Sequence, residues 1–378
     1  MTSIVPPGST IGVLGGGQLG RMLTTTARKM GYQVHTFSPE KDTPTGQVAN
    51  LSVSASYEDL DALRVFASQV QVVTLEFENI PIKAIDTVES LAPVRPSGTA
   101  LQITQQRTRE KNFLANHGFP TVPFASAVTL DELRKAVKSI GTPVVIKTAE
   151  FGYDGKGQHK VSTLADVEDV WNAIGHREAL VEKFVSLQSE VSVIAARGLD
   201  GTIAEYVLFK NCHRNHILDV ATAPADVDKS ITVRAVEIAR GILDQLQYFG
   251  VLCVEYFITT EGELLVNELA PRTHNSGHLT LEACATSQFE QQVRAICGLP
   301  LGSTKLLQPA AMANLLGDLW VEGEPNWAAT DLFPEVKLHL YGKKDPRRGR
   351  KMGHLTALGR TTEEAKQSVI SARKAVLR

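Results

Sequence analysis

The sequence predicts a protein of mixed class, with an α/β part followed by α+β parts, and three observations lead to this prediction. Residues 10–103 alternate between apolar runs and amphipathic segments, which is typical of a parallel sheet covered by helices. Residues 104–300 contain paired strand patterns and loops that are rich in glycine or in polar residues. Residues 301–378 show short strand patterns before one last helix, which indicates a small β-rich C-terminal domain. A length of 378 residues is enough for roughly two to three such domains.

The first predicted domain, residues 1–103, repeats a strand pattern followed by a helix pattern. Its apolar runs have the length of strands, and glycines open the helix that follows the first of them. The proline-rich stretch Pro93–Pro96 closes the domain, because proline continues neither a helix nor a central strand. The expected strands are Thr10–Leu14, Gln33–Phe37 and Val70–Leu75, and the expected helices are Gln18–Met30 and Asp59–Gln69.

The same periodicities predict the helices and strands in the rest of the chain. Leu133 and Val137 recur at helical spacing, whereas Val191 and Val193 alternate with polar residues as in a strand. Glu261-Gly262 separates two apolar runs and predicts a hairpin. The expected helices are Gln106–His117, Thr129–Ile140, 231–247, Phe289–Ile296 and one from Thr362; the expected strands are Val144–Lys147, Leu180–Val185, Glu190–Ala196, Val251–Thr259, Glu263–Leu269, Ala311–Leu315 and Glu335–Tyr341.

Charge and cysteine usage limit the partners that the chain can have. The formal net charge is −2, so no overall field would hold nucleic acid or an anionic membrane. The cysteines Cys212, Cys253, Cys284 and Cys297 form no C-x-x-C pair, which is typical of a reducing compartment. No apolar stretch approaches the roughly 20 residues that span a bilayer, and the N-terminus lacks the basic region of a signal peptide. We therefore expect a cytoplasmic protein.

The first glycine-rich turn, residues 15–20 (GGGQLG), follows a predicted strand and matches the pattern G-x-G-x-x-G. Such a turn lets an anion approach the free N–H groups of a helix N-terminus. The acid that would hold a dinucleotide's ribose is missing, since Phe37-Ser38-Pro39 stands where it should be and Glu40 is the nearest candidate. The pattern favours the phosphate of a mononucleotide over a nicotinamide dinucleotide. A turn needed only for packing is the third alternative.

The second glycine-rich run, residues 151–158 (FGYDGKGQ), follows the strand that contains Lys147. Its glycines would let backbone amides surround a polyphosphate, and Lys147 and Lys156 would add positive charge. It is not a Walker A loop, because no G-K-[ST] opens a helix there. We expect a flap over a nucleotide polyphosphate. The alternative is a hairpin whose lysines face solvent.

Two further groups of acids are candidates for nucleotide and metal binding. Glu182 ends a predicted strand and Glu190 follows it, so both could accept hydrogen bonds from adenine or ribose, or could face solvent. Glu255 and Glu268 lie inside apolar strands of the predicted hairpin and would share one face. Two facing carboxylates repel each other unless a cation lies between them, which with Asn267 beside them suggests Mg²⁺. The alternative is a pair of edge-strand acids that face water.

Two polar segments complete the candidates. The loop 270–278 (APRTHNSGH) follows a strand directly, where reacting groups gather, and its Arg272 suits a carboxylate or a phosphate. His274 and His278 lack the cysteine partners of a structural zinc site. The segment 341–354 concentrates six cations in a predicted turn. A single phosphate monoester suits it better than RNA, because no aromatic side chains interleave the charges, and a solvated basic hairpin is the alternative.

In combination, these motifs resemble one family. GGGQLGRM, TLEFENI (Thr74–Ile80), ITQQR (Ile103–Arg107), GYDGKGQ, EKFV, NELAPRTHNSGH and GRKMGHL (Gly349–Leu355) occur in this order. They resemble the N5-carboxyaminoimidazole ribonucleotide synthetases, the ATPase subunits of a two-part phosphoribosylaminoimidazole carboxylase system, from about residue 8 to about residue 360. The resemblance implies the ATP-grasp fold, with a pre-ATP-grasp domain at 1–103, an ATP-grasp domain at 104–300 that includes a flap at about 118–186, and a C-terminal domain at 301–378.

The resemblance also implies residue roles. Mg²⁺ would be held by Glu255 and Glu268, and the reacting centre would contain Tyr153, Asp154, Arg272 and His274. The ribonucleotide would contact Gln18, Leu19, Glu76, Asn79 and Arg272, with Lys343, Arg350 and Lys351 on its phosphate. ATP would contact Arg107, Lys147, Gly152, Tyr153, Asp154, Gly155, Lys156, Gly157, Gln158, Glu182, Lys183, Phe184, Val185, Glu190, His213, Asn267 and Glu268.

The implied reaction is the ATP-dependent carboxylation of 5-aminoimidazole ribonucleotide by bicarbonate, through carboxyphosphate, in purine biosynthesis. Asp154 is the first candidate for the general base and His274 the second. The resemblance suggests a homodimer that passes its product to a separate mutase. The alternatives are a formate-dependent glycinamide ribonucleotide formyltransferase of the same fold, a nicotinamide dehydrogenase, and a nucleotide-binding module without catalysis.

Overall fold

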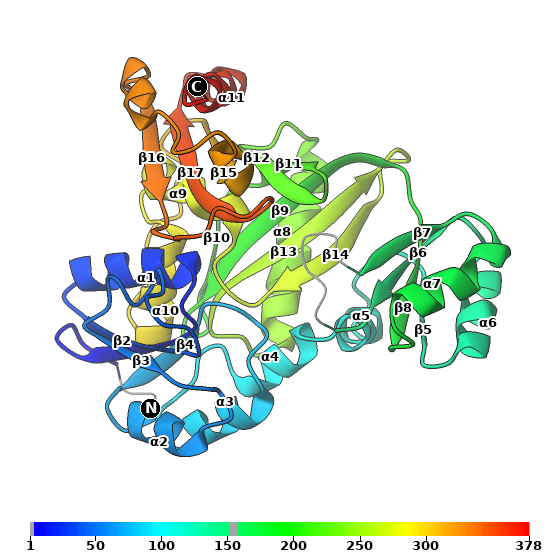
Figure 1. The fold of residues 1–378 in the computed structure, drawn as a ribbon, viewed down its shortest axis with the longest axis horizontal. Helices are drawn as coiled ribbons and strands as arrows, with labels where there is room; N and C mark the ends of the chain where they lie inside the picture. The colour runs from blue at the N-terminus through cyan, green and yellow to red at the C-terminus, as the bar shows by residue number, and fades with distance from the viewer. Residues whose placement is uncertain (1–3, 151–156, 378) are drawn as a thin grey trace.

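The computed structural model describes residues 4–150 and 157–377 and contains a parallel sheet near the N-terminus. Its strand order is β3-β2-β1-β4, and every neighbouring pair is parallel, as the alternating pattern predicts (Figure 1). The strands are β1 (Thr10–Leu14), β2 (Gln33–Ser38), β3 (Leu51–Ser54) and β4 (Val72–Leu75). The helices of this part are α1 (Gln18–Lys29), α2 (Leu60–Ala67), α3 (Ile82–Glu89) and α4 (Gly98–Thr104).

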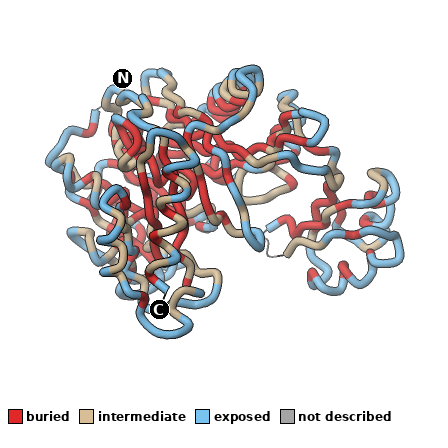
Figure 2. The backbone as a smooth tube through the Cα atoms, turned by 90° about the horizontal axis from the view of Figure 1, so that it is seen from above, coloured by how far each residue is buried: buried red, intermediate tan, exposed pale blue. Residues whose placement is uncertain are grey.

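A separate antiparallel sheet forms the lobe on the right of Figure 1. Its order is β5-β8-β6-β7, and a core of its own lies between the sheet and two helices. In Figure 2 this lobe has buried backbone inside and exposed backbone around it. We call it the flap lobe. Its elements are β5 (Phe124–Ala127), α6 (Leu130–Ile140), β6 (Val144–Thr148), β7 (Gln158–Val161), α7 (Val167–Ala173) and β8 (Ala179–Lys183).

The central sheet has the order β14-β13-β9-β11-β12-β15-β17-β16, with β10 paired to β9. The β13–β14 hairpin confirms the turn predicted at Glu261-Gly262. The predicted C-terminal strands do not form a sheet of their own, because β15 pairs with β12 and extends the central sheet. The strands are β9 (Leu187–Arg197), β10 (Ile203–Glu205), β11 (Phe209–Arg214), β12 (Ile217–Ala223), β13 (Gly250–Thr259), β14 (Leu264–Ala270), β15 (Ala310–Leu316), β16 (Val336–Leu340) and β17 (Lys351–Leu358).

Helices cover the central sheet and connect it to the other parts. Ile238 and Ile242 of α8 share one buried cluster with Val254 of β13, whereas Phe289 and Val293 of α10 belong to a cluster that includes side chains of α1. None of the helices in the described ranges is both long and apolar enough to cross a membrane. The four cysteines are free thiols. The remaining α-helices are α5 (Arg107–Asn116), α8 (Lys229–Gln245), α9 (Thr280–Ala283), α10 (Gln288–Cys297) and α11 (Thr362–Ala375).

The basic segment before the C-terminus differs from its prediction. The sequence predicts a turn over residues 341–354, but Lys351–His354 already belong to β17, which lies between β15 and β16. Met352 and His354 are buried there, at 4% and 0% exposure. The cations dominate the sequence pattern, whereas the buried run of β17 starts only after Lys351, at the end of the basic segment.

Candidate active site

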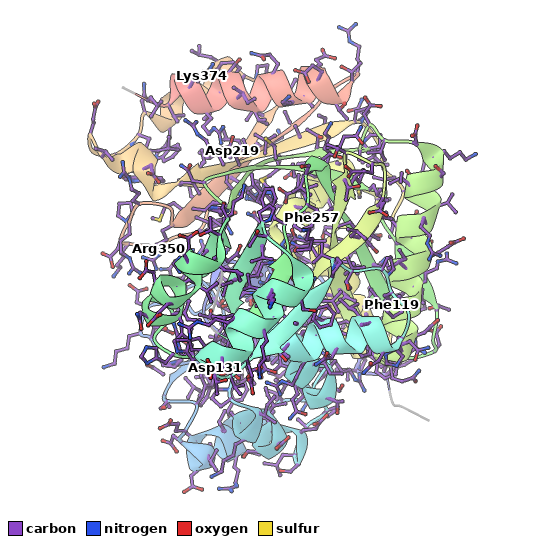
Figure 3. All side chains as sticks on the ribbon, turned by 90° about the vertical axis from the view of Figure 1, so that its right-hand side faces the viewer. Phe119, Asp131, Asp219, Phe257, Arg350 and Lys374 are labelled. Carbon is purple, nitrogen blue, oxygen red and sulfur yellow. The ribbon has the colours of Figure 1, made fainter. Side chains whose placement is uncertain are left out.

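A cleft of about 1540 Å³ gathers residues from the N-terminal sheet, the flap lobe and the central sheet. Figure 3 views the molecule from the side of the flap lobe; Phe257 of β13 and Arg350, just before β17, both line this cleft. The predicted site residues that line it are Gln18, Leu19, Glu76, Asn79, Arg107, Lys147, Gln158, Glu190, His213, Glu255, Asn267, Glu268, Arg272, His274, Lys343, Arg350 and Lys351. Segments up to several hundred residues apart in the chain therefore face one cavity.

Other predicted residues lie elsewhere. Lys183 donates through Nζ to the Gly141 carbonyl at 2.9 Å, and the Phe184 amide donates to the Pro143 carbonyl at 3.1 Å. Both contacts stay within the flap lobe. The predicted contacts among the described residues that do not line the cleft are Gly157, Glu182, Lys183, Phe184 and Val185. Gly152, Tyr153, Asp154, Gly155 and Lys156 lie outside the described residues.

Glu182 is turned toward two lysines. Its carboxylate is 2.5 Å from Lys147 Nζ and 3.2 Å from Lys111 Nζ, and the residue is only 3% exposed. Burial opposes ionisation of the carboxyl group, but the two ammonium groups outweigh it and lower the pKa of Glu182 to about 2. The sequence predicts that Glu182 accepts hydrogen bonds from the nucleotide. The carboxylate contacts Lys147, whose side chain lines the cleft, and the nucleotide contact stays a prediction.

Glu190 and His213 form a second pair in the same half of the cleft. Glu190 lies on β9 and His213 on the neighbouring β11, and His213 Nδ1 is 2.9 Å from a Glu190 carboxylate oxygen. Burial lowers the pKa of His213, but the adjacent Glu190 carboxylate outweighs this and raises the pKa. Arg107 opens α5 and donates through Nη1 to the Thr148 carbonyl at 2.9 Å. Arg107 and Lys147 both line the cleft and bring two cations to it.

Glu255 and Glu268 stand opposite each other in the β13–β14 pairing, as predicted from the hairpin. The alternative of two edge-strand acids fails for Glu255, because β13 has neighbours on both sides and the residue is 8% exposed. Glu268 lies on the edge strand β14 and is exposed on the wall of the cleft, as the alternative expects for an edge-strand acid. Desolvation by the surrounding cleft, together with the Glu255 carboxylate, raises the pKa of Glu268. Asn267 Oδ1, next in sequence, has no hydrogen-bond partner within the described part of the chain. This donor set fits a hard divalent cation.

Within the described residues, few side chains beyond this pair could act as metal ligands. No group of three or more histidine, cysteine, aspartate or glutamate side chains able to hold a metal occurs in residues 4–150 and 157–377. A cation bound by two carboxylates needs further oxygens from water or from a ligand. Mg²⁺ has this requirement in nucleotide sites, where it keeps several waters and takes phosphate oxygens as ligands.

His274 is fixed through both ring nitrogens. Nε2 is 3.0 Å from Glu255 Oε1, and Nδ1 is 2.9 Å from Ser276 Oγ. Burial disfavours the imidazolium, but Cys253 and the Glu255 carboxylate raise the pKa of His274 to about 10. Burial also opposes ionisation of Glu255, whereas His274 lowers the pKa of that carboxyl to about 2. His274 therefore acts in this arrangement as a hydrogen-bond donor to Glu255.

Arg272 forms a bidentate ion pair with Glu78, which was not predicted from the sequence. Its Nε and Nη2 donate to the two carboxylate oxygens of Glu78, at 2.5 and 3.0 Å. Burial opposes ionisation of Glu78, but Arg272 outweighs it and lowers the pKa of that carboxyl. Glu78 belongs to the EFEN segment, so the motif contained the signal, although the sequence did not show which partner the acid has.

The first glycine turn is filled by a side chain of the protein. Glu76 Oε2 lies 3.5 Å from the Gly20 amide, and a Cβ atom at Gly17 would come within 2.6 Å of both Glu76 carboxylate oxygens. A Cβ at Gly15 would lie 2.2 Å from Glu76 Cγ. The N–H groups at the start of α1 thus face a carboxylate where the sequence predicts a ligand phosphate. The glycines are needed because this carboxylate approaches the backbone so closely.

The C-terminal cations lie at the same end of the cleft. Lys343 Nζ donates to the Lys351 carbonyl at 2.7 Å, and Arg350 Nη1 donates to the Asp345 carbonyl at 2.9 Å. Lys344 pairs with Asp42 of the N-terminal part. This end of the cleft therefore has a positive side from the C-terminal segment and an acidic side at Glu76, which suits a phosphorylated ligand that also carries hydrogen-bond donors.

Comparisons with known proteins agree with this geometry. Residues 9–105 match the ribonucleotide synthetase preATP-grasp domain, 112–289 the ATP-grasp domain, and 310–368 the phosphoribosylaminoimidazole carboxylase C-terminal domain. The chain is 43% identical over 368 residues to the N5-carboxyaminoimidazole ribonucleotide synthase of Bacillus subtilis, covering 97% of this chain and 96% of that protein. The chain belongs to the N5-carboxyaminoimidazole ribonucleotide synthase family. It is thus an ATP-dependent ligase with the ATP-grasp fold.

Two solved structures of the synthase family resemble the chain over almost its whole length. A synthetase in its ADP complex superposes with a TM-score of 0.93 at 39% identity, covering 98% of both chains. The synthase of Aspergillus clavatus, in complex with ADP and 5-aminoimidazole ribonucleotide, gives a TM-score of 0.89 at 30% identity, covering 97% of this chain and 98% of that one. The expected ATP-grasp fold is confirmed.

Three functional candidates could not be read from the motifs alone. Glu78 pairs with Arg272, as described above. Glu110 of α5 is 4% exposed and accepts the Leu269 amide at 3.1 Å; burial and the nearby Glu268 raise the pKa of its carboxyl to about 8. Lys111 of the same helix contacts Glu182. The sequence predicts the helix, but only tertiary contacts show that Glu110 lines the cleft and that Lys111 contacts Glu182.

Proposed function

We infer that the protein catalyses the ATP-dependent carboxylation of 5-aminoimidazole ribonucleotide by bicarbonate, which gives N5-carboxyaminoimidazole ribonucleotide, ADP and phosphate in purine biosynthesis. The observation that carries this conclusion is the single cleft in which the candidate ATP residues and the candidate ribonucleotide residues face each other. The family membership and the relative solved with both ADP and 5-aminoimidazole ribonucleotide support the same conclusion.

The first step that we propose is attack by a bicarbonate oxygen on the γ-phosphorus of ATP. The bond from that phosphorus to the β–γ bridging oxygen breaks, ADP leaves, and carboxyphosphate forms. Such a transfer depends on positioning and on neutralising charge. Lys147, held by Glu182, and Arg107 would provide positive charge at this end of the cleft. Mg²⁺, held by Glu255 and Glu268, would neutralise charge on the phosphate oxygens.

In the second step, carboxyphosphate releases CO₂ and phosphate, and the exocyclic nitrogen of the ribonucleotide attacks the CO₂ carbon. The nitrogen then loses a proton to a base. We propose Asp154, which lies outside the described residues, as this base. His274 is the weaker candidate, because Nε2 faces Glu255 and Nδ1 faces Ser276. Arg272, fixed by Glu78, would stabilise the anionic intermediate.

The assay that tests this function measures ADP release by the purified protein with ATP, Mg²⁺ and bicarbonate. Adding 5-aminoimidazole ribonucleotide should stimulate the release strongly, since the carboxylation consumes the activated intermediate. Formate with glycinamide ribonucleotide serves as the comparison. Stimulation by that second pair alone would overturn the substrate and leave the fold unchanged.

Further expectations concern the assembly and the location. We propose that the protein forms a homodimer in the cytoplasm and that a separate mutase uses its product, as the resemblance to the family suggests. Sedimentation equilibrium tests the first of these. A mass of about 41.1 kDa at all concentrations would exclude the dimer, whereas twice that mass would support it.

A further inference from the structure

Lys111 is a buried lysine for which the reaction scheme has given no role. It lies on α5, which contacts β8 of the flap lobe and β14 of the central sheet and lies between the two in Figure 1. The residue is 2% exposed. Its Nζ donates to the Asn267 carbonyl at 2.7 Å and to the Val266 carbonyl at 3.2 Å. The same Nζ is 3.2 Å from Glu182 Oε1.

These contacts connect two parts of the cleft that must cooperate on one nucleotide. The two carbonyls belong to β14 and directly precede Glu268, the candidate metal ligand. Glu182 lies on β8 and uses its other oxygen to hold Lys147 Nζ at 2.5 Å. A continuous chain of polar contacts therefore runs from Lys147 through Glu182 and Lys111 to the backbone of β14.

The burial of this chain makes its geometry stiff. A buried ammonium group is costly unless oxygens surround it, so each oxygen around Lys111 is held in place by that requirement. Without the ammonium group, Glu182 would be balanced by Lys147 alone, and the carbonyls before Glu268 would lose a charged donor. Both the phosphate-facing lysine and the metal-facing carboxylate would then be less well placed.

We propose that Lys111 is a positioning residue that aligns Lys147 of the flap lobe with Glu268 of the central sheet for binding of the ATP–metal complex. The effect that this proposal expects on turnover rests on the proposed function. The effect that it expects on nucleotide binding is independent of that function, because ADP affinity can be measured without bicarbonate or ribonucleotide. Lys111 touches neither reactant and acts through Glu182 and β14.

The test compares Lys111→Met with the wild type and with Lys135→Met, which removes an exposed lysine from α6 of the flap lobe. ADP binding with Mg²⁺ is measured by calorimetry, and the KM for each substrate by ADP release. For Lys111→Met we expect the ADP dissociation constant to rise at least about tenfold, the loss typical of a charge-assisted contact. The KM for 5-aminoimidazole ribonucleotide should stay within about twofold in both variants.

A purely structural role would reduce the amount of folded protein without changing ADP affinity. If Lys111→Met does not fold, Lys111→Gln replaces it, because the amide can still donate to the Asn267 carbonyl while the charge facing Glu182 is removed. A folded variant of either kind with wild-type ADP affinity overturns the proposal. If the wild type itself shows no ribonucleotide-dependent turnover, the proposed function is overturned, whereas the comparison of ADP affinities remains valid.

Discussion

Replacing Glu78 by glutamine removes the charge that faces Arg272 while keeping the size of the side chain. The wild-type pair joins two carboxylate oxygens to Nε and Nη2 at 2.5 and 3.0 Å. Hydrogen bonds between charged groups contribute about 1.5–3 kcal/mol each. The side chain of Arg272 is 19% exposed and that of Glu78 is 27% exposed, so solvent screens both hydrogen bonds and lowers their combined contribution. We expect the substitution to remove about 2 kcal/mol of the interaction that orients Arg272.

This loss should appear in the step that uses Arg272. A change of about 2 kcal/mol corresponds to about a thirtyfold lower kcat/KM for 5-aminoimidazole ribonucleotide. ADP affinity should remain within about twofold, because the contacts of Glu78 are with Arg272 and Gln105 and not with Lys147 or Glu182. The assay is ribonucleotide-dependent ADP release together with ADP calorimetry. Glu89→Gln, an exposed change on α3, serves as the matched control.

Two results would refute the reasoning. Wild-type kcat/KM in Glu78→Gln would show that the pair does not orient Arg272 for the reaction. An equal loss in ADP affinity and in kcat/KM would show that the variant disturbs the whole cleft. In either case the proposed positioning of Arg272 by Glu78 would be refuted.

Three further predictions follow from single contacts. Gly17→Ala should weaken ribonucleotide binding but not ADP binding, because its Cβ would meet the Glu76 carboxylate at 2.6 Å; calorimetry with each ligand checks this. Glu268→Gln should raise the Mg²⁺ concentration for half-maximal ADP release at least about tenfold, and an unchanged titration would argue against a metal there. Since the pKa of Glu182 is lowered from 4.5 to about 2, its stabilisation is complete above pH 4.5 and disappears as the pH falls toward 2. The free energy of unfolding, measured in urea, should therefore fall more steeply between pH 4.5 and 2 for the wild type than for Glu182→Gln. Equal slopes for the two proteins would contradict this prediction.

The elements that the sequence predicted well are those whose buried positions are filled by apolar residues at regular spacing. Thr10–Leu14 is β1 with the predicted bounds, because an apolar run between a serine and glycines has no competing periodicity. The β13–β14 hairpin follows from two apolar runs around Gly262. By contrast, β11 and β12 were not predicted: buried and exposed residues alternate from Phe209 to Cys212, but the polar Asn211 occupies one of the buried positions, and His213 faces the cleft.

The site shows the same division. Residues in contiguous motifs, such as Glu255 and Arg272, could be found from the sequence because several functional groups cluster there. Lys111 and Glu110 could not, because one acid and one lysine on a helix usually face solvent. Their roles come from the position of α5 between the flap lobe and β14. A single sequence holds no record of such long-range contacts.

The coupling of ATP to carboxylation is tested most directly by following oxygen from bicarbonate. The protein is supplied with ¹⁸O-labelled bicarbonate, ATP, Mg²⁺ and 5-aminoimidazole ribonucleotide, and the phosphate released is analysed by mass spectrometry. Attack by bicarbonate on the γ-phosphorus places one labelled oxygen in each phosphate, with one N5-carboxyaminoimidazole ribonucleotide formed per ADP. Phosphate without label, released together with ADP, would show that water attacks ATP and would contradict the account.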